Sequence, residues 1–351
     1  MAKSKIIVVV GPTASGKTTL ATKIALRLCS GQAKKLHGIK GAEIISADSR
    51  QIYRGMDIGT AKPLRGSISN FQFLISKQIP KHKPQTRNYI CKEVRHHLID
   101  IKNPDENYTV AEYKRGALAV IRKILRKGKL PILVGGTGLY IKAVVDNLDI
   151  PAIAADKKLR RRLEATAKKH GLNYLFKKLV KLDPEAVYVI DPRNPRRVIR
   201  ALEVAVKTGK PFSAQRKTGK PLFDALIIGI NIPRQELKKR INARVDEMLK
   251  NGFVDETRNL VRKYGPKQKA FDAIGYREII RYLRGEITLA ATIDLIKKST
   301  WRYAKRQMTW FKKNKNTNWL HDRKTAERLV GQFLKQNPRT HAGGSLSTTR
   351  H

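Results

Sequence analysis

The stretch IIVVVGPTASGKTTLA, residues 6–21, decides the fold of this chain. Its residues 11–18, GPTASGKT, match the phosphate-loop pattern GxxxxGK[ST] at every fixed position. The apolar, β-branched run before the loop predicts a buried parallel strand, and apolar residues then recur at helical spacing as far as Leu28. In such a loop, backbone N–H groups and a lysine, here Lys17, hold phosphate oxygens. We therefore predict a phosphate site between a strand and a helix.

Strands and helices alternate along the chain after this loop. The runs AEIISADS, HHLIDI, LPILV and FDALIIGINI predict further strands, the first ending near Asp48 and the second around Asp100. Residues 110–129 repeat apolar side chains at helical spacing. This alternation predicts an α/β fold, a parallel sheet flanked by helices with its ligands at the carboxyl ends of the strands. With the phosphate loop, the expected architecture is P-loop NTPase-like.

The composition changes along the chain and predicts its domain organisation. Residues 1–147 and 212–335 form the α/β core with its C-terminal helices, and residues 148–211, which are basic and interrupted by Pro and Gly, form an all-helical insertion. Residues 336–351 lack apolar periodicity, which predicts a disordered tail. Residues 62–95 form a long basic connection that we expect to be a mobile surface excursion.

The chain is strongly basic, with 74 Lys and Arg against 28 Asp and Glu and a formal net charge of +46. Such an excess indicates a polyanionic partner, although a general Lys and Arg bias in the source organism would also produce it. Two arginine pairs, Arg196 with Arg200 and Arg240 with Arg244, are each spaced four apart and can present guanidinium groups to phosphates. Each pair alone is more typical of a solvated helix face.

Several function classes are disfavoured by what the sequence contains. Cys29 and Cys91 lie far apart without a CxxC motif, which argues against a disulfide framework or a zinc finger. The N-terminal apolar run is too short for a membrane span or signal peptide, so we expect a cytoplasmic protein with no membrane association. The adjacent His96 and His97 point in different directions and make a poor metal pair. The aromatic stripe around Trp301 is interpreted as core packing.

The loop alone does not identify its ligand. An ATP hydrolase normally has a strand that ends in an acid for Mg²⁺, but LPILV ends in Gly135-Gly136-Thr137-Gly138. Asp48 follows a short buried strand, where its carboxylate could act as a general base. It could equally cap the next helix. The hydroxyl of Thr18 is placed to ligate Mg²⁺.

Seven stretches in order resemble blocks of the bacterial tRNA dimethylallyltransferases across roughly residues 5–320. They are GPTASGKT, ISADSRQIYRGMDIGTAKP, HHLIDI, PILVGGTGLYI, RRVIRALEV, IGYREI and YAKRQMTWF. The resemblance implies transfer of a dimethylallyl group from dimethylallyl diphosphate to N6 of the tRNA adenosine 3′ to the anticodon (position 37), with release of pyrophosphate. The loop would then hold the diphosphate of an isoprenoid instead of ATP, and the partner would be a tRNA anticodon stem-loop.

The resemblance also implies roles for individual residues. Asp48 would be the general base, Thr13 and Ser15 would support the amine and the diphosphate, and an arginine of the 240/244 pair, Arg244 as the catalytic residue or Arg240 as a binding residue, would stabilise the leaving pyrophosphate. The residues implied to bind the diphosphate are Gly11, Pro12, Thr13, Ala14, Ser15, Gly16, Lys17, Thr18 (with Mg²⁺) and Arg240. The residues implied to contact tRNA are Asp48, Ser49, Arg50, Gln51, Thr137, Arg160, Arg196, Arg197, Val198, Ile199, Arg200, Asp272, Ala273, Ile274, Gly275, Tyr276 and Arg277.

The sequence departs from the family pattern in two places and leaves three alternatives. Residues 62–95 are longer and more basic than usual, and residues 31–41 are expanded. The alternatives are a small-molecule kinase that uses ATP, an adenylate prenyltransferase, and a nucleotide-dependent RNA-binding protein without covalent chemistry. The net charge and the carboxylate at Asp48 favour the tRNA enzyme, which we expect to be a monomer.

Overall fold

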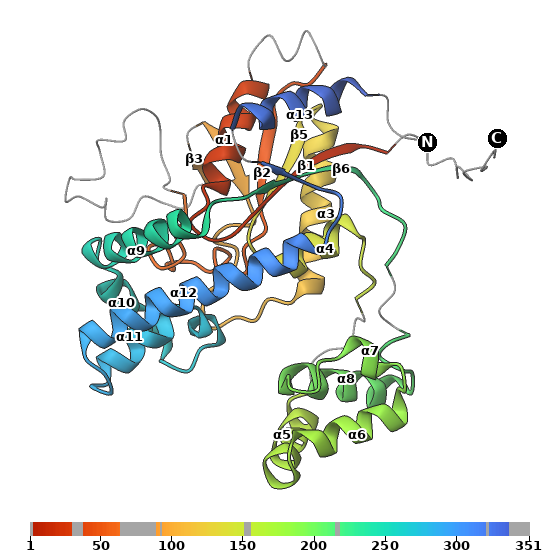
Figure 1. Cartoon of the computed structure of the whole chain (residues 1–351), viewed down its shortest axis with the longest axis vertical. Helices are drawn as coiled ribbons and strands as arrows, with labels where there is room; N and C mark the ends of the chain where they lie inside the picture. Colours follow the sequence, from red (N-terminus) through yellow and green to blue (C-terminus); the bar gives the residue numbers. More distant parts are fainter. Residues whose placement is uncertain are drawn as a thin grey trace, which may run out of the picture. The chain divides into compact units, whose positions relative to one another are not determined.

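The computed structural model describes residues 3–29, 38–63, 89–91, 93–150, 156–214, 218–320 and 323–336 (Figure 1). The basic connection 62–95 lies mostly outside the described residues, and so does the expected tail except for Gln336. The chain forms two compact units, Met1–Ile141 with Leu222–His351, and Lys142–Pro221. The second unit contains the stretch 148–211 that the sequence marks as an insertion.

The described residues of the first unit form a seven-stranded sheet in the order β3-β4-β2-β5-β1-β6-β7. Neighbouring strands are parallel except for the β3–β4 pair, which is antiparallel. The parallel α/β fold expected from the sequence is therefore confirmed. The strands are β1 (Lys5–Val10), β2 (Ala42–Ser46), β3 (Tyr89–Cys91), β4 (Val94–His97), β5 (Leu130–Val134), β6 (Asp224–Ile230) and β7 (Thr317–Leu320).

The prediction of a strand over HHLIDI was wrong in its position. Strand β4 covers Val94–His97 and ends before Leu98. Leu98 and Asp100 both have a positive φ, 60° and 55°, in the left-handed region that a strand cannot contain. The residues after β4 therefore turn, and Asp100 does not stand at a strand end.

Helices cover both faces of the sheet. Helices α1 and α13 share one hydrophobic cluster with Ile7 and Val9 of β1, while Ile6 and Val8, which point to the other face, are also buried. Helix α3 contacts β2 and β5. The described helices of this unit are α1 (Lys17–Leu28), α3 (Val110–Arg126), α9 (Arg234–Lys250), α10 (Phe253–Tyr264), α11 (Tyr276–Leu283), α12 (Leu289–Lys312) and α13 (Arg323–Lys335), with a 3-10 turn at Lys269–Asp272. Helix α4 (Gly138–Val145) begins in this unit and ends in the second.

A buried carboxylate ties three strands together near the beginnings of β2 and β5. Glu43 accepts from Lys129 Nζ (2.9 Å) and contacts His97 Nε2 (2.7 Å). Burial acts to raise the pKa of Glu43, but the hydrogen bonds from Lys129 and His97 outweigh it and lower that pKa to about 2. Strands β2 and β5 run parallel to β1, and the phosphate loop follows the carboxyl end of β1. This cluster therefore lies at the opposite ends of the strands from the candidate site.

Helix α10 holds two loops through Phe253 and Glu256. A Cβ at Gly59 or at Gly275 would lie 2.2 Å or 2.5 Å from the Phe253 ring, so both positions need glycine. Glu256 accepts the backbone N–H groups of residues 57–59 and the hydroxyl of Tyr276 (2.6 Å). The loop after β2 and the IGYREI stretch therefore both dock on this helix.

The second unit consists of α5 (Lys157–His170), α6 (Leu172–Leu182), α7 (Ala186–Val189) and α8 (Pro195–Thr208). It has a hydrophobic core of its own, which includes Leu175, Leu179, Val198 and Leu202. Asn194 caps α8 by accepting from the N–H of Arg197, and a proline occupies the first helical position, where no N–H is needed. The all-helical character expected for this stretch is confirmed.

Candidate functional site

The phosphate loop joins β1 to α1 at the carboxyl edge of the sheet. Lys17, the first residue of α1, donates from Nζ to the carbonyl oxygen of Pro12 (2.6 Å). The Ser15 hydroxyl is buried and, among the described residues, has no hydrogen-bond partner. Since a buried hydroxyl normally has a partner, this orphaned group indicates a place for a polar ligand.

Two cations and one carboxylate surround this loop. Arg244 donates from a terminal nitrogen to the Thr13 hydroxyl oxygen (3.3 Å). Burial, aided by the Arg244 guanidinium, lowers the pKa of Lys17 to about 7, and Asp48 opposes the shift only in part. Asp48 also opposes the lowering of the Arg244 pKa by burial. The loop, Arg244 and Asp48 therefore form one electrostatic site.

The structure separates the two arginines that the sequence could not distinguish. Arg240, one turn before Arg244 on α9, is exposed and donates from Nε to Glu236 Oε1 (2.6 Å). Arg244 instead reaches the phosphate loop at Thr13. Residues of α9 and α12 share a small buried cluster against which Ala14 of the loop packs, so α9 is held next to the phosphate loop.

Asp48 has a structural role as well as its place in the site. Its Oδ1 accepts from the backbone N–H of Arg50 (2.8 Å) and of Gln51 (3.4 Å), so the capping alternative describes one of its two oxygens. Oδ2 takes no part in these two bonds. Burial raises the pKa of Tyr303, and the negative charge of Asp48 contributes to the same shift, so α12 also approaches this carboxylate.

Residues 48–51 lie on a loop that is held by hydrogen bonds to several other segments of the chain. The N–H of Ser49 donates to Thr137 Oγ1 (3.1 Å), which brings two predicted tRNA-contact residues together. Arg50 donates to the carbonyl oxygens of residues 269 and 270 (3.1 Å each), and Gln51 accepts from the Ser46 hydroxyl (3.0 Å). The side chains of Arg50 and Gln51 are thus engaged within the protein.

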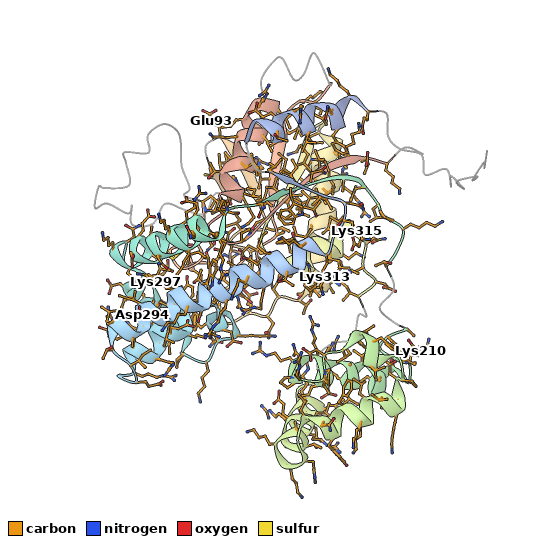
Figure 2. All side chains as sticks on the ribbon, in the orientation of Figure 1. Glu93, Lys210, Asp294, Lys297, Lys313 and Lys315 are labelled. Carbon is orange, nitrogen blue, oxygen red and sulfur yellow. The ribbon has the colours of Figure 1, made fainter. Side chains whose placement is uncertain are left out.

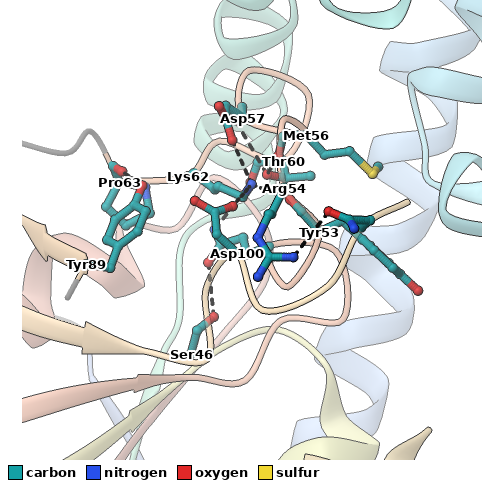
Figure 3. A network of polar contacts seen from close by, with 12 residues as sticks. Ser46, Tyr53, Arg54, Met56, Asp57, Thr60, Lys62, Pro63, Tyr89 and Asp100 are labelled. Carbon is teal, nitrogen blue, oxygen red and sulfur yellow. Dashed lines mark hydrogen bonds and ion pairs between the residues drawn. The ribbon is translucent and has the colours of Figure 1, made fainter. Parts of the chain in front are cut away.

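Lys62 is a buried anchor of this loop that sequence reasoning placed in a surface excursion. Its ammonium group, whose side chain is 2% exposed, contacts Asp57 Oδ1 (2.6 Å), Asp100 Oδ1 (2.5 Å) and the carbonyl oxygen of Tyr53 (Figure 3). The N–H of Asp100 in turn donates to the carbonyl oxygen of Gln51 (3.1 Å). A basic residue within a basic connection gives no sign that it is buried, so only the fold reveals this role.

Gln307 is the second residue that the sequence interpretation missed. It lies on α12, is 5% exposed, and accepts from the Thr13 N–H through Oε1 (2.8 Å). Its Nε2 donates to the carbonyl oxygen of Gly136 (2.9 Å). In the sequence it stands within the YAKRQMTWF block and on a helix that we interpreted as core packing, and neither feature assigns a role to its amide.

The candidate tRNA-contact residues of α8 divide into exposed and buried side chains. Arg196 and Arg197 are exposed, whereas Val198 and Ile199 are buried in the core of the second unit. Helical periodicity turns Val198 and Ile199 inward, so the arginines are the residues of this predicted segment that reach the surface, and its contact with tRNA stays a prediction.

Arg160 and Arg200 are held by a buried carboxylate. Glu203, which is fully buried, accepts from Arg160 Nε (3.0 Å) and Nη2 (2.7 Å) and from Arg200 Nη1 (2.7 Å). Burial acts to raise the Glu203 pKa, and these hydrogen bonds lower it below its ordinary value. About a third of each arginine side chain is exposed, so part of each remains on the surface.

The segment 272–277 shows the same division. Asp272 and Arg277 are exposed, while Ala273 and Tyr276 are buried and Tyr276 donates its hydroxyl to Glu256. Asp272 and Arg277 are therefore the side chains that this predicted segment offers to the surface, and its contact with tRNA stays a prediction. The IGYREI motif serves the packing of α10 and α11.

The described surface carries many lysines that point outward, as Lys210, Lys313 and Lys315 do in Figure 2. Across the described ranges, no three His, Cys, Asp or Glu side chains gather in a way that could hold a metal ion. Within the same ranges, none of the helices has the length and apolar character needed to cross a bilayer.

Comparisons with known proteins agree on one family. A family model described as IPP transferase matches residues 51–314. The chain is 42% identical over 320 residues to a tRNA dimethylallyltransferase of Symbiobacterium thermophilum, covering 91% of this chain and 89% of that protein. It is 43% identical over 336 residues to the tRNA dimethylallyltransferase of Caldanaerobacter subterraneus, with 93% and 95% covered.

Solved structures are similar over nearly the whole chain. The tRNA isopentenylpyrophosphate transferase of Bacillus halodurans has a TM-score of 0.62 and 38% identity, with 95% of this chain and 97% of that chain covered. A eukaryotic dimethylallyltransferase described as acting on tRNA has a TM-score of 0.64 and 26% identity, with 88% of this chain and 69% of that chain covered.

Proposed function

The chain belongs to the IPP transferase family, and on that premise we propose that it transfers a dimethylallyl group from dimethylallyl diphosphate to N6 of a tRNA adenosine, releasing pyrophosphate. The observation that carries the proposal is the meeting of a phosphate loop, Arg244 and the Asp48 carboxylate in one site. A leaving diphosphate needs fixed donors and cations, and an attacking amine needs a proton acceptor. This site offers both.

The proposed reaction is a displacement at the allylic carbon. N6 of adenine forms a bond to C1 of the dimethylallyl group, and the bond from C1 to the diphosphate oxygen breaks. Asp48 takes the proton that N6 loses, with Oδ2 as the oxygen that is not engaged by Arg50 and Gln51. The electron pair of the broken bond leaves with the pyrophosphate.

The leaving diphosphate would be bound by hydrogen-bond donors and cations that the fold has already oriented. Arg244 donates to the Thr13 oxygen, so the hydroxyl hydrogen of Thr13 remains available for the diphosphate. The Ser15 hydroxyl offers another donor. Lys17, with its pKa lowered to about 7 by burial, regains its positive charge most readily next to a polyanion. We propose these four residues as the diphosphate site.

The residues of the loop also suit Mg²⁺. This ion commonly keeps several waters and takes few protein ligands beside substrate phosphates, which agrees with a single hydroxyl ligand, that of Thr18 in the first turn of α1, and with the orphaned Ser15 hydroxyl in the same phosphate loop. When bound, Mg²⁺ neutralises charge that develops on the leaving diphosphate. We propose Thr18 as its protein ligand.

The tRNA partner is supported by the charge of the second unit. Lys142–Pro221 carries twenty Lys and Arg against eight Asp and Glu. Exposed arginines such as Arg196 and Arg197 suit the phosphates of an RNA stem, and the target base must leave its stack to reach Asp48. We propose the anticodon stem-loop as the bound region and its adenosine 37 as the target. A monomer acting in the cytoplasm remains our expectation.

The test is direct. The protein is incubated with unmodified tRNA, radiolabelled dimethylallyl diphosphate and Mg²⁺, and label is measured in the tRNA and in free AMP. We expect label in the tRNA alone. Label passing to AMP, or phosphate transfer from ATP in a parallel assay, would refute the proposal in favour of the adenylate prenyltransferase or the kinase.

A further inference from the structure

A chain of three hydrogen bonds connects the phosphate loop to the loop that carries Asp48. The Thr13 N–H donates to Gln307 Oε1 (2.8 Å), and Gln307 Nε2 donates to the Gly136 carbonyl oxygen (2.9 Å). The next residue, Thr137, accepts the N–H of Ser49 at Oγ1 (3.1 Å). Ser49 directly follows Asp48, so one buried amide stands between the two halves of the site.

The orientation of this amide is fixed by its partners. A backbone N–H can only donate and a carbonyl oxygen can only accept, so the Oε1 of Gln307 must face Thr13 and its Nε2 must face Gly136. No reversal of the amide satisfies both contacts. A carboxylate or an apolar side chain at this position would lose at least one of them.

The surroundings leave little freedom to this arrangement. A Cβ at Gly136 would lie 2.1 Å from Gln307 Nε2, so this close approach requires glycine. Tyr303 lies one turn earlier on α12, with its hydroxyl 3.9 Å from the position of a Cβ at Gly136, and Ala304 packs against α9. In Figure 1, α12 is the long blue helix of the first unit. The same rigid helix therefore contacts both loops.

We infer that Gln307 is a positioning residue that sets the distance between the diphosphate at the phosphate loop and the carboxylate of Asp48. The inference rests on the proposed function, because that reaction requires N6, C1 and the leaving oxygen to be aligned between these two loops. A misplacement of about 1 Å in such an alignment can reduce the rate about 10²-fold. The role also means that the Thr13 N–H, being donated to Gln307, is not a donor to the diphosphate.

The experiment compares Gln307→Met with Gln332→Met, a matched change on the exposed face of α13. Methionine has a similar volume but neither hydrogen bond. We expect Gln307→Met to lower kcat for tRNA prenylation about 10²-fold, with smaller changes in KM for both substrates. Gln332→Met should behave like the wild type. A Gln307→Met enzyme with unchanged kcat, or one that loses only substrate affinity, would overturn the inference.

Gln307→Glu tests the two hydrogen bonds of the Gln307 side chain separately. A glutamate can still accept the Thr13 N–H, but it cannot donate to the Gly136 carbonyl oxygen. We expect kcat to fall about as far as in Gln307→Met, while the added negative charge next to Thr13 also weakens the binding of a saturated alkyl diphosphate. Wild-type kcat in this variant would show that the link to Gly136 does not matter.

A double-mutant cycle decides the matter if Gln307→Met does not fold. Gly136→Ala should lower kcat in the wild type, because its methyl group displaces the amide. The same change in a Gln307→Ser background should have little further effect. Multiplicative effects would overturn the inference. A wild-type enzyme that labels no tRNA would instead refute the proposed function itself.

Discussion

Removing Arg244 should slow prenyl transfer strongly, whereas removing Arg240 should not. The two side chains are one turn apart on the same helix, which makes each the control for the other. Arg244 donates to Thr13 at 3.3 Å, while Arg240 is exposed and paired with Glu236. We therefore expect single-turnover rates of Arg244→Ala to fall by about 10²–10³, or about 2.7–4 kcal/mol, as for loss of one preorganised donor to developing charge.

Arg240→Ala should change the rate by less than about twofold. The exposed ion pair that it removes stabilises a helix by only about 0.3–0.5 kcal/mol, so its loss leaves α9 and Arg244 in place. Arg244→Lys keeps the charge but lacks the planar fork of donors, so its rate should lie between those of Arg244→Ala and the wild type. The rates are measured with saturating tRNA and labelled dimethylallyl diphosphate. Equal losses in Arg240→Ala and Arg244→Ala would refute the assignment of Arg244 to the leaving group.

Three further predictions concern carboxylates. Asp48→Asn keeps an oxygen that can cap the turn but cannot take a proton, so transfer should fall at least about 10²-fold while tRNA binding, followed by filter retention, is unchanged; a parallel loss of binding would return Asp48 to a purely structural role. Glu203→Gln should lower the free energy of unfolding by about 3 kcal/mol in denaturant titrations, since it leaves two arginines without their buried partner, and an unchanged midpoint would contradict this. Glu43 has a pKa of about 2 in the folded protein against 4.5 ordinarily, so its contribution to the free energy of unfolding is present above pH 4.5 and is lost as the pH falls through 2. In Glu43→Gln, the free energy of unfolding should therefore fall by roughly 3 kcal/mol less than in the wild type between these pH values. The same pH dependence in both proteins would contradict the lowered pKa.

The central elements of the fold could be predicted because their signals are local. Strands β1, β5 and β6 are built on continuous apolar runs, β2 has an apolar pair next to Glu43, and α3 repeats its apolar residues at helical spacing. Strands β3 and β7 have three and four residues, and their conformation depends on the neighbours with which they pair. No periodicity in such short segments distinguishes them from loops.

The site was predictable where a motif defines it and unpredictable where tertiary contacts do. GPTASGKT identifies the phosphate loop from its spacing alone. Lys62 and Gln307 bind partners that are distant in sequence, Asp100 and Gly136, so no local pattern marks them. Arginines of one helix likewise look equivalent until the fold shows that Arg200 faces Glu203.

The contact of Phe253 with two glycines has a consequence for how the sequence can change over time. The ring fills the space that a side chain at position 59 or 275 would need, and these positions lie more than two hundred residues apart. Each glycine also has a second constraint, because a Cβ at position 59 would lie 2.6 Å from the Tyr276 ring and Gly275 has a φ of 97°. A smaller residue at position 253 would therefore not release either glycine, and both should persist across relatives even where position 253 varies.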